Sequence, residues 1–140
     1  FETPGDFQGW QPAHDLTNCA VTEGALTGLT THIDPYFVSP LIKLPAGGFS
    51  TVVVRMKLEL AGGESFIARG AKLYWTTSKA PAFCPESGVG FETIGDGQWH
   101  DYEMSVSQNP NWTDTVTRLR IDPCMVFDVK VAIDSVRLKK

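Results

Sequence analysis

Alternation of apolar and polar residues is the feature that most limits what this chain can fold into. Val52, Val54, Met56, Leu58 and Leu60 take every second position, and from Arg55 onward charged residues stand between them. The same period of two recurs over His100–Val106 and over Thr117–Asp122. This period places apolar side chains on one face of a β-strand and polar ones on the other. One-sided strands of this kind are typical of antiparallel sheets that turn one face toward water.

Gly and Pro, 13 and 9 of the 140 residues, fall between short segments rich in Val, Thr, Phe and Tyr. No long stretch has the apolar spacing of a helix. The segments predict about eight strands, a number that packs best as two sheets. We therefore predict an all-β, antiparallel two-sheet β-sandwich of the jelly-roll type, formed by residues 1–140 as a single domain. The predicted strands are Ala20–Thr31, Tyr36–Leu44, Ser50–Leu60, Ser65–Thr77, Val89–Ile94, Trp99–Ser107, Thr115–Asp122 and Val126–Leu138.

Charge and hydropathy exclude several classes of partner. The formal net charge is −4, and the chain has no run of Lys or Arg. It therefore lacks the electrostatic footprint for binding nucleic acid or an anionic membrane. Apolar runs such as Val52–Val54 are far too short to span a bilayer. Phe1 does not open a signal peptide, so we expect it to lie at a processing boundary.

The sequence contains none of the common catalytic motifs. Gly-x-Ser-x-Gly is absent, and His14, His32 and His100 are isolated from one another. The 16 carboxylates leave a glycosidase pair open, but a sandwich of this size is a small frame for a deep acid/base cleft. We therefore predict that the chain is not an enzyme.

Two covalent features remain open. Cys19, Cys84 and Cys124 show no Cys-x-x-Cys spacing, so they suggest neither a redox pair nor a zinc site. A Cys84–Cys124 disulfide is feasible if their loops meet at one rim, and the alternative is three reduced, buried thiols. Asn111-Trp112-Thr113 matches a glycosylation sequon, which is a common tripeptide and weak evidence.

Several motifs spread along the chain point to a known architecture. They are Phe1-Glu2-Thr3 with Gly9-Trp10, Asp34-Pro35-Tyr36, Gly95-Asp96-Gly97-Gln98-Trp99-His100-Asp101-Tyr102, Leu119-Arg120-Ile121-Asp122-Pro123 and Ile133–Leu138. Together they resemble β-sandwich carbohydrate-binding modules with a galactose-binding-like jelly roll, which are appended to secreted glycoside hydrolases and polysaccharide lyases. The resemblance implies a secreted, extracellular, non-catalytic module that binds polysaccharide or oligosaccharide and accompanies a parent catalytic domain. The alternative is a structural or protein-interaction β-sandwich without a sugar site.

The same resemblance implies a structural calcium ion that joins the first and last strands. Glu2 and Asp134 match the positions that supply carboxylates, and Glu23 adds an oxygen from a hairpin turn. Calcium takes six to eight oxygen ligands, so carboxylates and loop carbonyls suit it. The alternative is that these are ordinary surface acids.

Sugar binding needs flat apolar rings beside planar hydrogen-bonding groups. The stretch from Tyr74 to Glu86 offers Trp75, Phe83 and Glu86 as candidates. Neighbouring residues of a strand point to opposite faces, so only one of Tyr74 and Trp75 is outward. Trp75 is two residues from Leu73, so it shares the face of Leu73 and is expected to point inward. We keep Trp75 as a candidate because a bulge in this strand would reverse its face.

Two further groups complete the predicted site. Arg118 and Arg120 share the polar face of one strand, where Arg69 joins them if its strand is adjacent; such arginines recognise hydroxyls or acidic sugars, or simply form a solvated edge. His32 and Tyr36 become ligand contacts if their loop lies beside the Trp75–Glu86 loop; the alternative is that Asp34-Pro35 sets a turn and Tyr36 packs. Trp112 is either a platform at a loop tip or a plug for the end of the sandwich.

Overall fold

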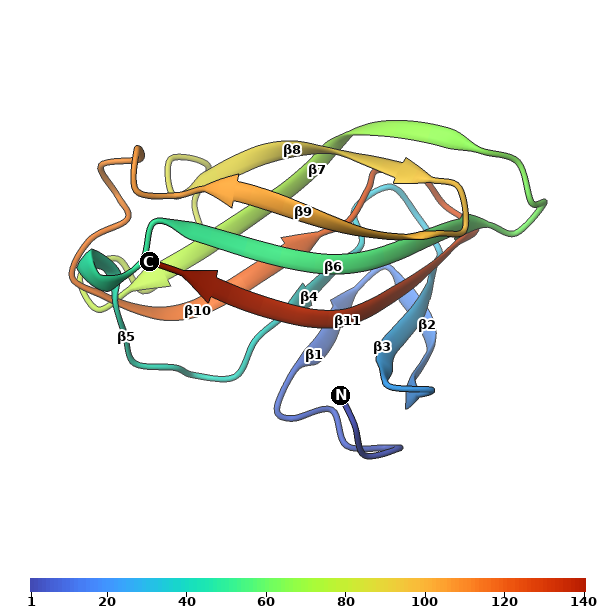
Figure 1. The fold of residues 1–140 in the computed structure, drawn as a ribbon, viewed down its shortest axis with the longest axis horizontal. Coiled ribbons are helices and arrows are strands. Elements are labelled where there is room, and N and C mark those ends of the chain that lie inside the picture. Colours follow the sequence, from blue (N-terminus) through green and yellow to red (C-terminus); the bar gives the residue numbers. More distant parts are fainter.

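Two antiparallel sheets face each other in the computed structural model, which describes all residues from 1 to 140. In Figure 1, β6 and β11 cross the front of the molecule, and β10 and β7 lie behind them. The first sheet has the order β1 (Gln11–His14), β4 (Tyr36–Val38), β10 (Thr115–Asp122), β7 (Phe66–Thr77) and β8 (Gly88–Gly95), with β5 (Leu44–Pro45) also paired to β10. The second has the order β2 (Leu16–Thr22), β3 (Ala25–Thr30), β11 (Val129–Lys139), β6 (Thr51–Leu60) and β9 (Trp99–Ser105). The predicted all-β sandwich is confirmed.

The strand prediction fails at the N-terminal end. Ala20–Thr31 is not one strand, because Glu23 and Gly24 have φ of 53° and 78° and turn the chain between β2 and β3. Two successive positive φ angles suit the right-handed twist of a tight hairpin. The predicted Tyr36–Leu44 strand is likewise reduced to β4 and, after a break, the short β5.

The two inner faces build one core from the alternating apolar residues. Val52, Val54, Met56 and Leu58 of β6 are all fully buried. They share the core with Leu73 and Trp75 of β7 and Ile121 of β10, among others. The polar residues that alternate with the apolar ones in each strand consequently face outward. This leaves the two outer faces of the sandwich as candidate binding surfaces.

Trp75 and Trp112 belong to this core, which corrects two of the predicted sugar contacts. Trp75 is 0% exposed and Trp112 7% exposed, and their rings meet edge to face at 5.1 Å. The Trp75 indole N–H donates to the Asn111 carbonyl at 2.9 Å. The Trp112 indole donates to the carbonyls of Ala46 and Phe49, beside the 3₁₀ turn η1 (Ala46–Gly48). Trp112 is therefore the plug of the sandwich end, and neither ring is available to a ligand.

All three cysteines are free thiols, so the Cys84–Cys124 bridge is not formed. The Cys84 thiol donates to the Ser87 hydroxyl, and the Cys124 thiol donates to the Val126 carbonyl. Burial raises the pKa of Cys124 to about 11, which keeps this thiol protonated and unreactive at neutral pH.

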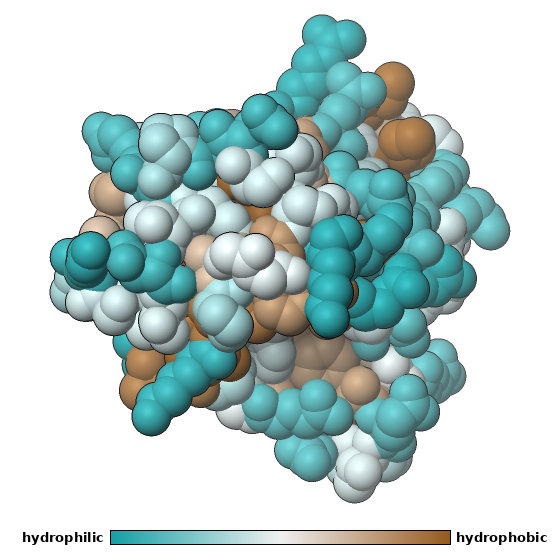
Figure 2. Space-filling view, turned by 60° about the vertical axis from the view of Figure 1, so that its left-hand side comes forward, coloured by the Kyte–Doolittle hydropathy of each residue, from teal (hydrophilic) through white to brown (hydrophobic).

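The surface mixes polar and apolar side chains. In the view of Figure 2, hydrophilic side chains dominate the periphery and enclose several small hydrophobic patches. No helix of the structure has the length and apolar character needed to cross a membrane.

Candidate functional site

Arg120 and Asp122 form the polar centre of the outer face of the first sheet. They project outward from β10 because Leu119 and Ile121, the alternate residues, are buried in the core. Arg120 Nε donates to Asp122 Oδ1 and its terminal nitrogen donates to Oδ2, both at 2.8 Å. The second carboxylate near the guanidinium is that of Asp34, at 3.6 Å. The bidentate pairing with Asp122 fixes the plane of the guanidinium.

The environment of this pair shifts both of its pKa values. Burial raises the pKa of Asp122 above its ordinary value, and the hydrogen bonds and charge of Arg120 offset only part of that effect. Burial acts to lower the pKa of Arg120, but the hydrogen bonds and charge of Asp122 outweigh it, so the pKa is raised. Arg120 therefore remains a cation, held in place by a largely buried carboxylate.

Three aromatic rings surround the Arg120 guanidinium. Its carbon lies 3.6 Å from the ring centroid of Tyr36 on β4, 5.0 Å from that of Tyr74 on β7 and 6.0 Å from that of Phe83 in the β7–β8 loop. The two tyrosines flank Arg120 because β4 and β7 are the strands paired to β10. The Tyr36 ring also stacks on the His14 imidazole, at 5.1 Å and 8°.

Gly88 on β8 gives Tyr74 its position. A Cβ atom at Gly88 would lie 2.6 Å from Cδ1 of the Tyr74 ring, which is too close for any side chain. The ring thus lies across the neighbouring strand at a point where that strand has no side chain. At Gly90, two residues further along β8, the nearest atom to a Cβ would be 3.8 Å away.

Two shallow hollows meet at Phe83. One, of about 140 Å³, is lined by Tyr74, Phe83, Cys84, Pro85 and Arg120. The other, of about 310 Å³, is lined by Phe83 and Arg118 together with Gly9, Gln11, Val38, Ser39 and Pro40. We call this surface the Arg120 face, and it comprises Tyr36, Tyr74, Phe83, Arg118, Arg120 and Asp122. It places flat rings next to fixed hydrogen-bonding groups, an arrangement suited to a ligand with both apolar faces and hydroxyls.

Of the predicted sugar contacts, Tyr36, Phe83, Arg118 and Arg120 come together on this face. Glu86 lies exposed in the same loop as Phe83, and its carbonyl accepts hydrogen bonds from Asn109 and Asn111. His32 is not part of the face: it is highly exposed, and its ring nitrogen lies 3.7 Å from Asp15.

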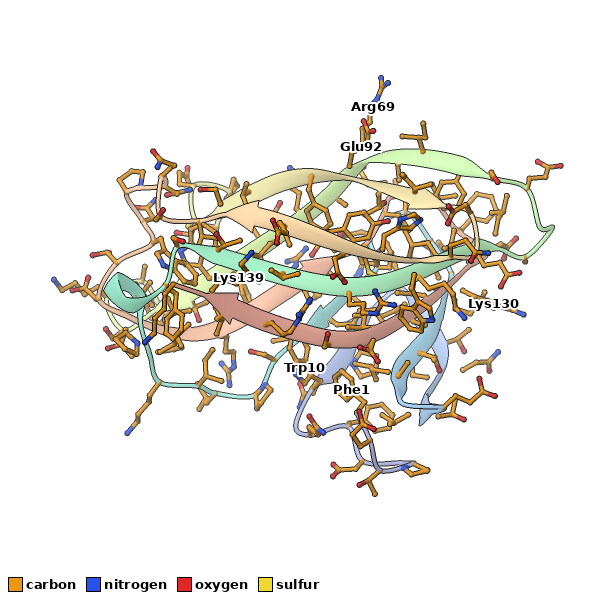
Figure 3. The ribbon with its side chains drawn as sticks, viewed as in Figure 1. Phe1, Trp10, Arg69, Glu92, Lys130 and Lys139 are labelled. Atoms are coloured by element: carbon orange, nitrogen blue, oxygen red, sulfur yellow. The ribbon has the colours of Figure 1, made fainter.

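Arg69 is also a correction. It lies on β7, the neighbour of β10, but at the far end of that strand, where it pairs with Glu92 at 3.3 Å. Figure 3 shows Arg69 and Glu92 projecting together from the upper edge of the sandwich. Its side chain is 85% exposed and does not contact the Arg120 face.

Sequence reasoning missed Tyr74 and His14. The signal for Tyr74 was available, because parity with Leu73 makes Tyr74 outward when Trp75 is inward. The register shift of β7 against β8 falls between Ala68 and Ala71, several residues before Trp75. It therefore does not change the face to which the Trp75 side chain points. His14 carried no signal, since β1 was not predicted as a strand.

The predicted calcium ligands do not form a metal site from side chains alone. No group of three or more His, Cys, Asp or Glu side chains is arranged to hold a metal ion. Glu2 and Glu23 are exposed, and Asp134 lies 4.0 Å from the Arg55 guanidinium. A calcium ion here would depend on backbone carbonyls for most of its ligands.

The fold is that of β-sandwich carbohydrate-binding modules. A family 28 module specific for non-crystalline cellulose superposes with a TM-score of 0.66 at 17% identity, covering 97% of this chain and 89% of that one. A family 4 module gives 0.59 at 11% identity, covering 96% and 81%. A variant of a family 29 module gives 0.60 at 11% identity, covering 93% and 81%. No protein-family model matches the chain, and neither does any curated protein.

Proposed function

We propose that this chain is a non-catalytic module that binds polysaccharide through the Arg120 face. The observation that carries the proposal is the Arg120 guanidinium, held by Asp122 and flanked by the Tyr36 and Tyr74 rings. Tyrosine rings offer apolar surface to the C–H side of a pyranose, and the fixed guanidinium and carboxylate suit its hydroxyls.

The comparisons support this proposal through the shared fold and through the spacing of one arginine and one aspartate. Among the family 29 structures are alanine variants of an arginine and of an aspartate two positions further on, solved to probe ligand recognition. Arg120 and Asp122 have the same spacing. Binding should be weak, with Kd of about 10–100 μM, because a few rings and hydrogen bonds on a shallow surface provide only about −5.5 to −7 kcal/mol.

Affinity gels containing different polysaccharides, followed by calorimetry with the retained glycan, test the proposal. Tyr36→Ala and Tyr74→Ala should each weaken binding about tenfold, the loss expected from about 1.4 kcal/mol of stacking. Arg69→Ala is the matched control, because it removes an exposed side chain from the far end of β7. Retention on no gel would favour the alternative of a structural or protein-interaction domain, and release of reducing ends would overturn the non-catalytic assignment.

Two broader properties belong to the same proposal. We infer that the module accompanies the catalytic domain of a secreted glycoside hydrolase or polysaccharide lyase, where tethering raises the local concentration of substrate. The localisation would then be extracellular. Purification of a longer gene product that contains this module and degrades the retained glycan would support this inference. A longer product without a catalytic domain would contradict it.

Calcium remains a proposal with Glu2, Asp134 and Glu23 as its carboxylates. Phe1, the neighbour of Glu2, lines the same hollow as Asp134, which supports a site near the N-terminus. Calcium would pin the terminal segment and raise the melting temperature. A chelator should lower the melting temperature and leave the glycan affinity of the Arg120 face unchanged, because these residues are not part of that face.

A further inference from the structure

The outer face of the second sheet carries a separate hollow of about 310 Å³. Residues from all five strands of that sheet line it. We call it the Trp99 groove, and its lining includes Thr27, Lys57, Glu59, Trp99, Lys130 and Ala132. Figure 3 places Lys130 on β11, in the sheet at the front of the view.

Sheet register aligns the floor of this groove. Thr27 is opposite Ala132, Ala132 is opposite Lys57, and Lys57 is opposite Trp99. These four residues therefore form one row across β3, β11, β6 and β9. Three strand spacings make the row about 14 Å long. The small side chain of Ala132 leaves its middle hollow, which gives a trough rather than a flat surface.

Trp99 closes one end of the trough and is partly exposed there. Lys57 Nζ lies 5.0 Å from its ring centroid, and the Arg55 guanidinium lies 5.6 Å from it. These cations hold the indole on the sheet surface by cation–π attraction. Trp99 thus differs from the two core tryptophans, because its ring reaches the surface beside polar groups.

The charges of the groove indicate what kind of ligand it suits. Lys57 and Lys130 supply two positive charges, and Glu23 and Glu59 supply two negative ones. A surface with balanced charges gives no electrostatic advantage to an anionic ligand. Carboxylate, ammonium and hydroxyl groups around a partly exposed indole instead match an uncharged ligand with many hydroxyls.

We propose that the Trp99 groove is a second binding site, specific for a neutral oligosaccharide. Trp99 would stack on a pyranose, while Lys57, Glu59 and Thr27 would bind hydroxyl groups. This inference goes beyond the proposed function, because it uses the other sheet and none of the residues of the Arg120 face. The two sites lie on opposite outer faces, so one module holds two glycan chains at once.

Indole resonances of ¹⁵N-tryptophan-labelled protein test the proposal directly. Of the four tryptophans, Trp75 and Trp112 are hydrogen-bonded within the core, and Trp10 packs on Phe1 beside a different hollow. A shift of the Trp99 signal therefore reports on the groove. The probes are cellohexaose, laminarihexaose and mannohexaose, with hexagalacturonate as the anionic comparison. At least one neutral hexaose should shift the Trp99 resonance, in the wild type and in the Tyr36→Ala/Tyr74→Ala double variant. In that double variant, Trp99→Ala should weaken binding at least tenfold, and Trp99→Phe should weaken it less.

Glu103→Gln is the matched control, since Glu103 shares the strand and outer face of Trp99 but pairs with Lys139, outside the groove. It should leave affinity unchanged. The inference is overturned if no neutral hexaose shifts Trp99, or if hexagalacturonate alone does. Loss of all binding in the double variant with an unmoved Trp99 signal would leave the Arg120 face as the only site. Undiminished binding in the double variant with a shifted Trp99 signal would instead overturn the proposed function.

Discussion

Arg120 and Asp122 are joined by two hydrogen bonds of 2.8 Å although both project from the same strand, two residues apart. The aspartate side chain is only 10% exposed and the arginine 19%. Because one strand contributes both partners, the guanidinium is oriented before any ligand arrives. Such preorganisation reduces the side-chain entropy lost on binding.

Replacing Arg120 tests this pairing through both binding and stability. Arg120→Ala should weaken glycan binding by about 1–3 kcal/mol and lower the free energy of unfolding by about 1–3 kcal/mol, because it leaves Asp122 without its partner. The double variant Arg120→Ala/Asp122→Ala should recover much of the stability and none of the binding. Calorimetry and urea denaturation measure the two effects, and an unchanged unfolding curve for Arg120→Ala would contradict the pairing argument.

Acid should partly rescue Arg120→Ala. Burial raises the pKa of Asp122, so a proton on this carboxyl favours the folded state, and that benefit is lost as pH rises through the folded-state pKa. Removing Arg120 strengthens this effect, because only the charge of Lys72 then acts to lower the pKa of Asp122. The stability difference between the variant and the wild type should therefore shrink from pH 7 toward pH 4. A difference independent of pH would mean that Asp122 moves into solvent once its partner is gone.

Gly88 should control glycan binding without contacting the ligand. Gly88→Ala places a methyl group against the Tyr74 ring and should displace that ring, weakening binding about tenfold, as expected for loss of a stacking contact of about 1.4 kcal/mol. Gly90→Ala is the matched control, because a Cβ there meets nothing closer than 3.8 Å. Equal affinities for the two variants, measured by calorimetry, would show that the position of the Tyr74 ring over Gly88 does not affect glycan binding.

The adjacent aromatics Tyr74 and Trp75 should have opposite roles. Trp75→Ala should lower the free energy of unfolding by about 3–5 kcal/mol, since it opens a cavity in the core. Tyr74→Ala should cost far less stability and should weaken glycan binding. Urea denaturation and affinity gels separate the two variants, and a stable Trp75→Ala that no longer binds would refute the assignment.

Asp96 should stabilise the fold at neutral pH and lose this effect in acid. The backbone N–H of Gln98 lowers the pKa of Asp96, and a hydrogen bond with His100 lowers it further. Its contribution is complete above the unfolded-state pKa of about 3.9 and disappears as pH falls through the lower folded-state pKa. Asp96→Ala should therefore be less stable than the wild type at pH 7 and nearly equal to it below pH 3. Glu64→Ala, at an exposed loop position between β6 and β7, is the surface-acid control.

The period of two allowed the strand at the centre of the candidate site to be predicted. Thr115–Asp122 has the same bounds in the sequence prediction and in the structure, so Arg118 and Arg120 were correctly placed in one outward row. Alternation determines which face a side chain takes, and this information is local.

Which strands lie on either side of that row could not be predicted. Tyr36 and Tyr74 flank Arg120 because β4 and β7 pair with β10, and no local pattern encodes such long-range pairing. His14 lies on β1, whose residues Gln11–His14 neither alternate nor carry β-branched side chains. Trp75 shows a different kind of error. The alternation of side chains correctly indicated that Trp75 faces the core, but it was kept as a candidate because an aromatic platform for sugar was expected.

Internal compensation of the Arg120 charge has a kinetic consequence. A guanidinium already neutralised by Asp122 exerts little long-range attraction on an approaching chain, so electrostatic steering should not accelerate association. The association rate should then change little with ionic strength, in contrast to sites built from unpaired cations. A module with this property would bind glycan equally well in fresh water and in brine.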